Sequence, residues 1–291
     1  MDSDLNALLP RIERLLDRLD NASYPSLPDW KTTRAARWSA QSGGLKPIRH
    51  PQRVALKDLL AIDEQKQRVD TNTRQFVTGK PANNVLLTGA RGCGKSSLVK
   101  AIHAKYAPKG LRLVEVDKAG LPSLPDLFDL LADADYRFIV FIDDLTFAEH
   151  EPGYASLKAA LDGSLAGPSD NVLIYATSNR RHLMPEYMAE NLETRHLGGE
   201  VHPGEATEEK ISLSDRFGLW VSFHVMDQDT YLAIARHWVI QLGVIQLGAA
   251  ALGAPADESF ERAALQWSLG RGARNGRVAW QFARDWAGRH A

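Results

Sequence analysis

Residues 89–96 combine glycines, a lysine and a hydroxyl at the spacing that binding a chain of phosphate groups requires. They read GARGCGKS and fit the pattern GxxxxGK[ST]. The glycines let backbone N–H groups curl around phosphate oxygens, and the positive end of a following helix adds to the attraction. In such a loop the lysine reaches the β- and γ-phosphates of a nucleotide, and the hydroxyl binds Mg²⁺. The expected phosphate-binding residues are Gly89, Ala90, Arg91, Gly92, Cys93, Gly94, Lys95, Ser96 and Ser97, with Ser96 also a magnesium ligand.

Cys93 is the single cysteine of the chain, which excludes a disulfide framework and any multi-cysteine metal site. A lone thiol suits a reducing compartment. Within the phosphate loop it permits two interpretations: a redox switch on nucleotide binding, or a small residue that the loop tolerates. We favour the second.

Two adjacent carboxylates follow a short apolar run, at a place where a nucleotide-bound metal could be held. Residues 136–144 read YRFIVFIDD, which is typical of a buried strand that ends in paired acids. Asp143 is expected to hold Mg²⁺ through its water shell. Asp144 is expected to orient or deprotonate the water that attacks the γ-phosphate.

These side chains need elements that bring them together, and the hydrophobic pattern predicts such elements. Short apolar runs alternate with helical patterns, which indicates a mainly parallel sheet covered by helices on both faces. The expected strands are 85–88, 111–116, 138–142, 172–177 and 219–225, and the expected helices between them include 95–106, 123–132 and 154–165. After Asp227 only helical patterns remain, which predicts a small helical domain over 228–242, 257–269 and 274–288.

The N-terminal part of the chain has a different pattern. Leucines and an isoleucine at helical spacing predict an amphipathic helix over 4–20. Residues 21–50 are rich in Pro, Ser and Gly and indicate a linker or a surface arm. The stretch 30–57 is basic and contains Trp30 and Trp38. It could contact nucleic acid, or it could be a solvated linker whose tryptophans dock on the body.

Several motifs in the expected order resemble the AAA+ ATPases, a superfamily of P-loop NTPases, over roughly residues 55–291. VLIYATSNRRHL resembles the sensor 1 strand, which implies that Asn179 contacts the γ-phosphate or the attacking water. SLSDRFGL resembles the arginine-finger box, which implies that Arg216 reaches the γ-phosphate held by a neighbouring subunit. NGRVAWQF resembles sensor 2, with Arg277 as the phosphate contact. LLAIDEQKQRV is similar to the segment that covers adenine, with Ile62 packed against the base.

Two narrower resemblances refine this assignment. ATSNRRHL and DRFGLW are similar to sequences of replication initiators and helicase loaders. Closer still is a bacterial family of stand-alone AAA+ proteins with one ATPase module, which is recognised by PANNVLLTG, GKSSLVKA, FIDDLTF and EEKISLSDRFGLW. That family carries no settled physiological role that could be transferred.

The sequence departs from the superfamily pattern at the catalytic base. The Walker B strand of AAA+ proteins usually ends Asp-Glu, whereas this chain has Asp143-Asp144. Aspartate is one methylene shorter, and a misplacement near 1 Å can cost on the order of a hundredfold in rate. Either Asp144 is a slow base or Glu149 reaches in from the following loop. We therefore expect slow turnover without a partner.

Together the motifs and the resemblance predict an α/β fold: a three-layer P-loop NTPase of the AAA+ type with a parallel sheet. The expected domains are an N-terminal helix and basic arm over 1–51, the nucleotide-binding domain over 52–226 and a helical lid over 227–291. The resemblance implies ATP and Mg²⁺ as ligands, ATP hydrolysis, and a homo-oligomeric ring or spiral, because the finger acts in trans. The client, protein or DNA, stays open. The alternative is a slowly hydrolysing, ATP-gated switch or loader; a small-molecule kinase leaves the finger and sensor 2 motifs unused.

Composition sets the remaining limits on class. The formal net charge is -1, which excludes a protein that coats polyanions by bulk charge. Hydrophobic residues make up 44% and charged residues 24% of the chain, as in ordinary globular proteins. Residues 238–256 carry no formal charge, but their glutamines, glycines and alanines and the missing basic flank argue against a membrane span. We expect a cytoplasmic protein without membrane insertion.

Overall fold

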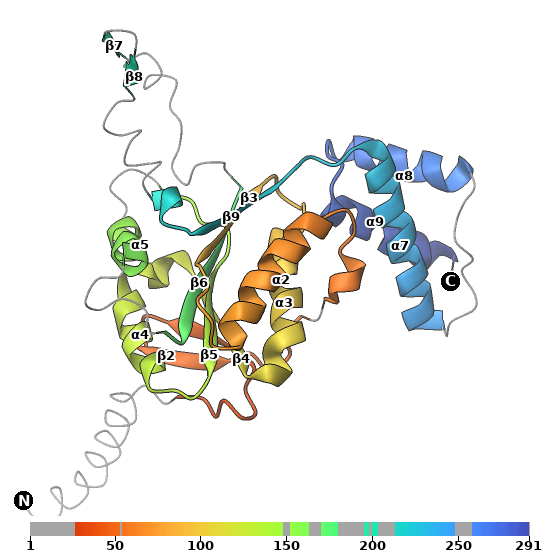
Figure 1. The fold of residues 1–291 in the computed structure, drawn as a ribbon. Helices are drawn as coiled ribbons and strands as arrows, with labels where there is room; N and C mark the ends of the chain where they lie inside the picture. The colour runs from red at the N-terminus through yellow and green to blue at the C-terminus, as the bar shows by residue number, and fades with distance from the viewer. Residues whose placement is uncertain are drawn as a thin grey trace, which may run out of the picture.

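The computed structural model of the chain describes residues 27–52, 54–147, 152–162, 170–179, 195–197, 200–202, 213–247 and 258–290. Its centre is a seven-stranded sheet with the order β2-β1-β4-β5-β6-β3-β9 (Figure 1). All neighbouring strands run parallel except β1 and β2, which form an antiparallel hairpin at one edge. The strands are β1 (Ala35–Ser39), β2 (Gly44–Pro47), β3 (Val85–Gly89), β4 (Leu111–Val116), β5 (Arg137–Ile142), β6 (Val172–Ser178) and β9 (Leu219–Phe223).

Helices cover both faces of this sheet, so the body has three layers (Figure 1). One face packs against α2 (Asp63–Val77) and α3 (Lys95–Tyr106), and the other against α4 (Leu124–Ala132) and α5 (Pro152–Asp162). The central strands are buried on both faces and read as continuous apolar runs, as parallel sheets require. The predicted α/β fold with a mainly parallel sheet is confirmed.

Short elements connect these layers. Within the described ranges, 3₁₀ turns cover η1 (Leu56–Asp58), η2 (Ala107–Lys109) and η3 (Lys118–Ser123). A separate two-stranded hairpin pairs β7 (Arg195–Leu197) with β8 (Glu200–His202). Neither β7 nor β8 belongs to the central sheet.

Three helices follow the sheet and form a helical unit beside it (Figure 1). They are α7 (Gln228–Leu247), α8 (Glu258–Gly270) and α9 (Gly276–His290), and they share a core of their own. Aromatic rings contribute to this core: Phe260 packs edge-on against Phe282 and Trp286, with ring centroids 5.3 and 5.2 Å apart. The C-terminal helices that the sequence predicted are present, and α7 extends further than expected.

None of the helices in the described ranges combines the length and the apolar character that crossing a bilayer requires.

The hairpin of β1 and β2 corrects one expectation, because residues 35–47 belong to the sheet rather than to a linker or surface arm. Trp30 and Trp38 are buried in the core, so they are not free to stack on nucleic-acid bases. Trp38 donates from Nε1 to the Ser123 hydroxyl at 2.8 Å. The buried guanidinium of Arg112 donates to the Trp30 carbonyl oxygen at 2.6 Å. The expected docking of the tryptophans on the body is thus what the structure shows.

The sequence missed this hairpin because its strands are short and interrupted by basic residues. Arg37 lies exposed between buried neighbours and pairs with Glu115 of β4, with the guanidinium 2.9 Å from the carboxylate. The domain boundary at residue 52 stays a prediction. The helix predicted over 4–20 lies outside the described residues.

Candidate functional site

The phosphate loop lies between β3 and α3, at the carboxyl end of the sheet's parallel strands. Gly89 ends β3 with φ +140°, and a Cβ there would collide with the backbone of Phe223 in β9. Gly94 has φ +103° and caps α3, which begins at Lys95 without a side-chain cap. The first N–H groups of α3 can therefore serve an anion, as the motif predicts.

Lys95 is held in place although only 6% of its surface is exposed. Its ammonium donates to the carbonyl oxygens of Gly89 at 2.6 Å and Ala90 at 2.9 Å. It also donates to Oδ1 of Asn179 at 3.0 Å. A buried ammonium needs such acceptors. The lysine of the loop and the polar residue predicted as sensor 1 are thus in direct contact.

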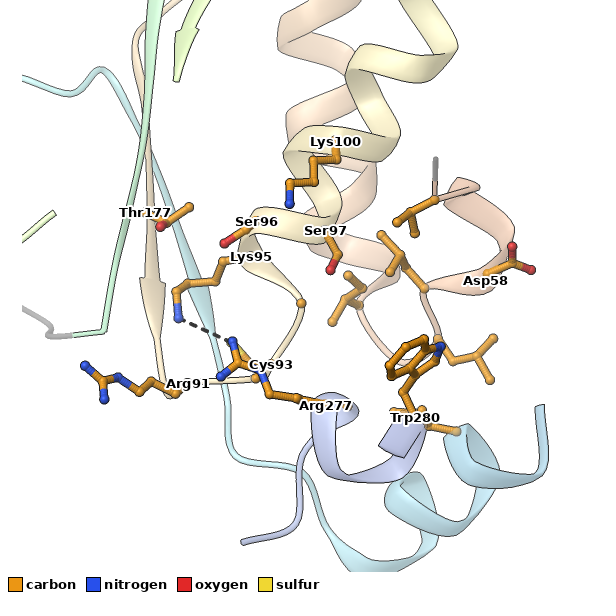
Figure 2. Close-up of a pocket in the computed structure, with 18 of the residues that line it drawn as sticks. Asp58, Arg91, Cys93, Lys95, Ser96, Ser97, Lys100, Thr177, Arg277 and Trp280 are labelled. Atoms are coloured by element: carbon orange, nitrogen blue, oxygen red, sulfur yellow. Dashed lines mark hydrogen bonds between the residues drawn. The ribbon is translucent and has the colours of Figure 1, made fainter. Parts of the chain in front are cut away.

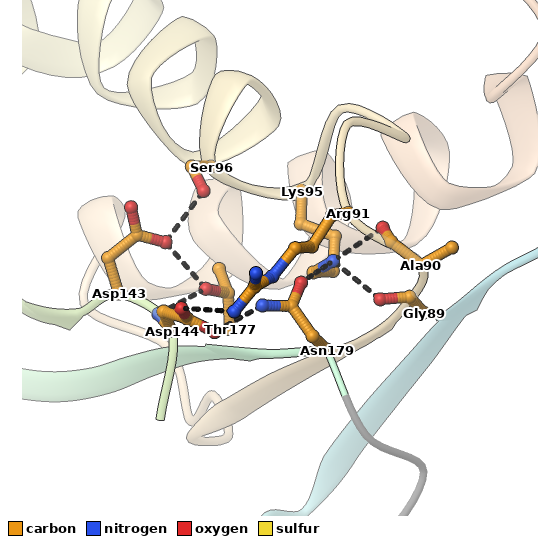
Figure 3. A network of polar contacts seen from close by, with 9 residues as sticks. All are labelled: Gly89, Ala90, Arg91, Lys95, Ser96, Asp143, Asp144, Thr177 and Asn179. Carbon is orange, nitrogen blue, oxygen red and sulfur yellow. Dashed lines mark hydrogen bonds and ion pairs between the residues drawn. The ribbon is translucent and has the colours of Figure 1, made fainter. Parts of the chain in front are cut away.

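Asp143 gathers two hydroxyl groups at the end of β5 (Figure 3). Ser96 of α3 and Thr177 of β6 each donate to its Oδ1 at 2.6 Å. A carboxylate and hydroxyl oxygens are hard donors of the kind that Mg²⁺ takes, often with water completing the shell. The residues present therefore fit a magnesium ion held by Ser96 and Asp143, as the sequence predicted.

Asp144 adopts a left-handed backbone conformation with φ +55°, which aspartate tolerates better than most residues. Its N–H donates to the Thr177 hydroxyl at 2.9 Å, which fixes the peptide after Asp143. Its Oδ1 accepts a hydrogen bond from Nδ2 of Asn179, and its Oδ2 lies 3.6 Å from the Arg91 guanidinium. The alternative base, Glu149, lies outside the described residues.

A cavity of about 750 Å³ opens onto these groups and extends to the helical unit (Figure 2). Its lining joins the phosphate loop with Ser97, the segment around Ile62, and Arg277 and Trp280 of α9. Figure 2 shows Arg277 extending from α9 toward the loop, with Trp280 on the side of the cavity where Asp58 lies. The structure thus brings the residues predicted for phosphate, adenine and sensor 2 contacts to one cavity, except Gly89 and Ala90, which do not line it.

The helical unit touches the phosphate loop directly. The N–H of Arg277 donates to the Gly92 carbonyl oxygen at 3.3 Å. A Cβ on Gly92 would lie 2.6 Å from Oδ1 of Asn275, and φ at Gly92 is +78°. Only glycine permits this close approach, so the loop and the start of α9 are matched surfaces.

The sequence analysis missed several lining residues, among them Thr177, Lys100 and Trp280. Lys100 donates from Nζ to Oε1 of Gln52 at 3.1 Å, and both residues line the cavity. Trp280 stands three residues after Arg277, on the same face of a helix, and this spacing could have revealed it. Thr177 lies two residues before Asn179, and only the sheet order places it beside Asp143.

Arg216 does not line this cavity. Its guanidinium forms an ion pair with Asp162 at the end of α5. The surface partners considered from the sequence, Glu208 and Glu209, lie outside the described residues. The role of Arg216 in a neighbouring subunit's site stays a prediction.

Cys93 is buried, with 4% of its surface exposed. Burial raises the pKa of its thiol, and the nearby Lys95 ammonium only partly opposes this effect. A protonated, buried thiol is a poor nucleophile. The structure therefore favours the interpretation of Cys93 as a small residue of the loop.

With this site in view, the family can be assigned. A family profile described as "Protein of unknown function (DUF815)" matches residues 31–290. The chain belongs to the DUF815 family. This confirms the expected membership in a family that carries no settled role. No curated protein sequence matches the chain.

Solved structures similar to this DUF815 chain include RuvB and PCH-2. RuvB, the Holliday junction branch migration motor of Thermotoga maritima, matches with a TM-score of 0.45 and 15% identity over 79% of this chain and 63% of that chain. A mutant of the same RuvB matches with a TM-score of 0.49 and 14% identity, over 79% of this chain and 63% of that one. PCH-2 of C. elegans matches with a TM-score of 0.49 and 18% identity, over 77% and 62%. The DUF815 chain thus spans less than two thirds of the length of these proteins.

Proposed function

We propose that this AAA+ protein binds ATP with Mg²⁺ and hydrolyses it to drive a conformational change in an assembly. The observation that carries the proposal is the convergence of Lys95, Ser96, Asp143 and Asn179 on one cavity that the helical unit completes. A buried ammonium, a metal-binding pair of oxygens and an amide are the groups that phosphoryl transfer requires. Catalysis then consists of positioning and charge stabilisation by groups already in place.

Each residue has a definite task in this proposal. Lys95 places its positive charge against the β- and γ-phosphates, and Ser96 and Asp143 hold the magnesium ion. The ion, when bound, would neutralise negative charge on the phosphate oxygens. Asn179 orients the attacking water, and the Asp144 carboxylate accepts its proton. Arg277 faces the same cavity from α9 and would add charge on the lid side.

The second candidate function is a switch that binds ATP and hydrolyses it rarely. One observation favours it: both carboxylate oxygens of Asp144 face partners, Asn179 and Arg91. A base held in this way must change partners before it can accept a proton from water. Single-turnover hydrolysis far slower than the 1–100 s⁻¹ or so typical of kinases, with capture of a partner only in ATP, would favour the switch.

Assembly is part of the proposal, because Arg216 lies outside the protomer's own cavity. As an arginine finger it would serve the site of a neighbouring copy, in a ring or an open spiral. ATP would then act as a clamp between neighbours, and its loss would open the joint. The client, protein or DNA, stays open, and burial of Trp30 and Trp38 removes base stacking by these residues from the argument for DNA.

Nucleotide binding is the first requirement of the proposal and can be measured directly. Calorimetric titration of the wild-type chain with ATP and Mg²⁺ should give saturable binding, and Lys95→Ala should weaken it by at least about a hundredfold. Lys105→Ala is a matched control on the same helix, because Lys105 pairs with Asp70 and does not line the cavity. Binding that Lys95→Ala leaves intact would contradict the proposed site.

A further inference from the structure

The phosphate-loop pattern GxxxxGK[ST] leaves position 91 open, because only the backbone N–H groups of this part of the loop bind phosphate. The pattern therefore gives the Arg91 side chain no role. In the structure its guanidinium points at the proposed catalytic base: Nη2 lies 3.6 Å from Oδ2 of Asp144. Both side chains are accessible, at 75% and 54% of their surface. Arg91 lines the cavity together with Asp144. An arginine in this place is a second cation at the phosphate end of the site, besides Lys95.

Four side chains form a continuous polar chain across this end of the cavity (Figure 3). The Lys95 ammonium donates to Oδ1 of Asn179, whose Nδ2 donates to Asp144, which in turn faces Arg91. The two cations stand at the ends, and the carboxylate stands between the amide and the guanidinium. A γ-phosphate that reaches Asn179 in this cavity therefore comes within the field of Arg91 as well.

The contact between Arg91 and Asp144 is suited to exchange. Ion pairs between exposed side chains are weak, because water screens the charges and two flexible chains must be ordered. A terminal phosphate carries more charge than one carboxylate, and a guanidinium matches its oxygens with two parallel hydrogen bonds. The γ-phosphate of a nucleoside triphosphate should therefore replace Asp144 as the partner of the guanidinium, whereas a diphosphate has no γ-phosphate to do so.

We propose that the Arg91 side chain discriminates nucleoside triphosphates from diphosphates, by leaving Asp144 for the terminal phosphate and so releasing the base. This inference rests on the proposed function, because it requires that the cavity binds ATP. It adds a side chain of the loop, acting in its own subunit, to the residues that recognise the γ-phosphate. It also links the arrival of the substrate to the freeing of the carboxylate that activates water.

The first test compares equilibrium binding of a non-hydrolysable ATP analogue and of ADP, each with Mg²⁺. Arg91→Ala should lower the affinity for the analogue by about tenfold and change that for ADP by less than about twofold. Arg91→Lys should keep part of the preference, because it retains the charge but loses the fork of donors. Equal losses for the two nucleotides, or no loss, would overturn the proposal.

A double-mutant cycle tests the exchange itself. Asp144→Asn removes a negative charge that repels the terminal phosphate, so it should raise affinity for the analogue with or without Arg91. It also removes the group that competes with the phosphate for Arg91. If Arg91 must leave Asp144, the rise should be about two- to fivefold larger with Arg91 present than with Arg91→Ala. Equal rises in both backgrounds would show that the two residues act independently and would overturn the exchange.

The outcomes separate this inference from the proposed function. Lys95→Ala should lose the analogue and ADP alike, whereas the Arg91 variants should affect the analogue alone. If the wild-type chain binds both nucleotides and the Arg91 variants bind them equally well, only the inference fails. If the wild-type chain binds neither, both fail. Thermal unfolding of Arg91→Ala should match wild type, because the side chain is largely exposed.

Discussion

Asp143 illustrates how single residues make this site. A carboxylate that accepts hydrogen bonds from two hydroxyl groups, of Ser96 and Thr177, is fixed in orientation before any cation arrives. The two donors come from α3 and β6, so three elements meet at one oxygen atom. Such preorganisation is what a metal site needs, because a freely rotating carboxylate would have to be ordered on binding.

Asp143→Asn tests this account at the residue scale. The substitution keeps the shape of the side chain but removes the negative charge that a magnesium ion requires. We expect Mg²⁺-dependent ATP turnover to fall by at least about a hundredfold, because the charge stabilisation of the metal is lost. Turnover is to be measured over a range of Mg²⁺ concentrations. Ser178→Ala at the neighbouring end of β6 is the control, and unchanged turnover in Asp143→Asn would contradict the assignment.

Among the secondary-structure elements, α3, which follows the phosphate loop, is anchored beside β1 by a histidine. His103 of α3 is buried, and its Nε2 lies 2.9 Å from the carbonyl oxygen of Arg34, just before β1. Burial lowers the pKa of His103 to about 4, with the positive charges of Arg112 and Arg34 adding to the effect and the bond to Arg34 opposing it. The neutral imidazole is therefore part of the packing between α3 and the sheet.

The lowered pKa of His103 predicts a pH dependence of stability. Between pH 6.5 and about 4 the unfolded chain binds a proton at His103 that the folded chain does not, so the free energy of unfolding falls as the pH falls. The full effect is about 3 kcal/mol, since each pKa unit corresponds to about 1.4 kcal/mol. Urea unfolding of wild type and His103→Gln at pH 7 and pH 4.5 measures it. The difference between the two proteins should shrink at the lower pH; a constant difference would contradict the prediction.

Most of the sheet could be read from the sequence, and the exceptions have physical reasons. The apolar runs at 85–88, 111–116, 138–142 and 172–177 became β3, β4, β5 and β6, because strands buried on both faces are apolar throughout. The hairpin of β1 and β2 was missed because it lies at the edge, where exposed basic residues interrupt its short runs of buried side chains. Its pairing with β4 is a tertiary contact that no local pattern reveals.

For the site, spacing predicted Lys95, Ser96 and Asp143 because each sits at a strand or helix end that the motif defines. It could not predict Thr177 beside Asp143, since that contact depends on β6 lying next to β5. Nor could it predict that Arg91 faces Asp144, or that Asp162 pairs with Arg216. These contacts join segments that only the folded sheet brings together.

At the scale of the whole molecule, the protomer supplies most of a site but leaves one predicted residue outside it. The sheet provides the phosphate loop and the acids, and the helical unit closes the cavity with Arg277 and Trp280. Arg216 instead forms an ion pair with Asp162 away from this cavity. If Arg216 is an arginine finger, it can act only on the site of another copy, and activity must depend on assembly.

The measurement that tests the central claim most directly is steady-state ATP turnover over a range of protein concentrations, for wild type, Arg216→Ala and Asp162→Asn. We predict that specific activity rises with protein concentration. Arg216→Ala should lower it by at least about a thousandfold, the lower end of the effect that an arginine finger has on kcat. Asp162→Asn breaks the same ion pair but keeps the guanidinium, so it should retain activity. Turnover that is independent of concentration and equal in Arg216→Ala would contradict the account and indicate a monomeric nucleotide-binding protein.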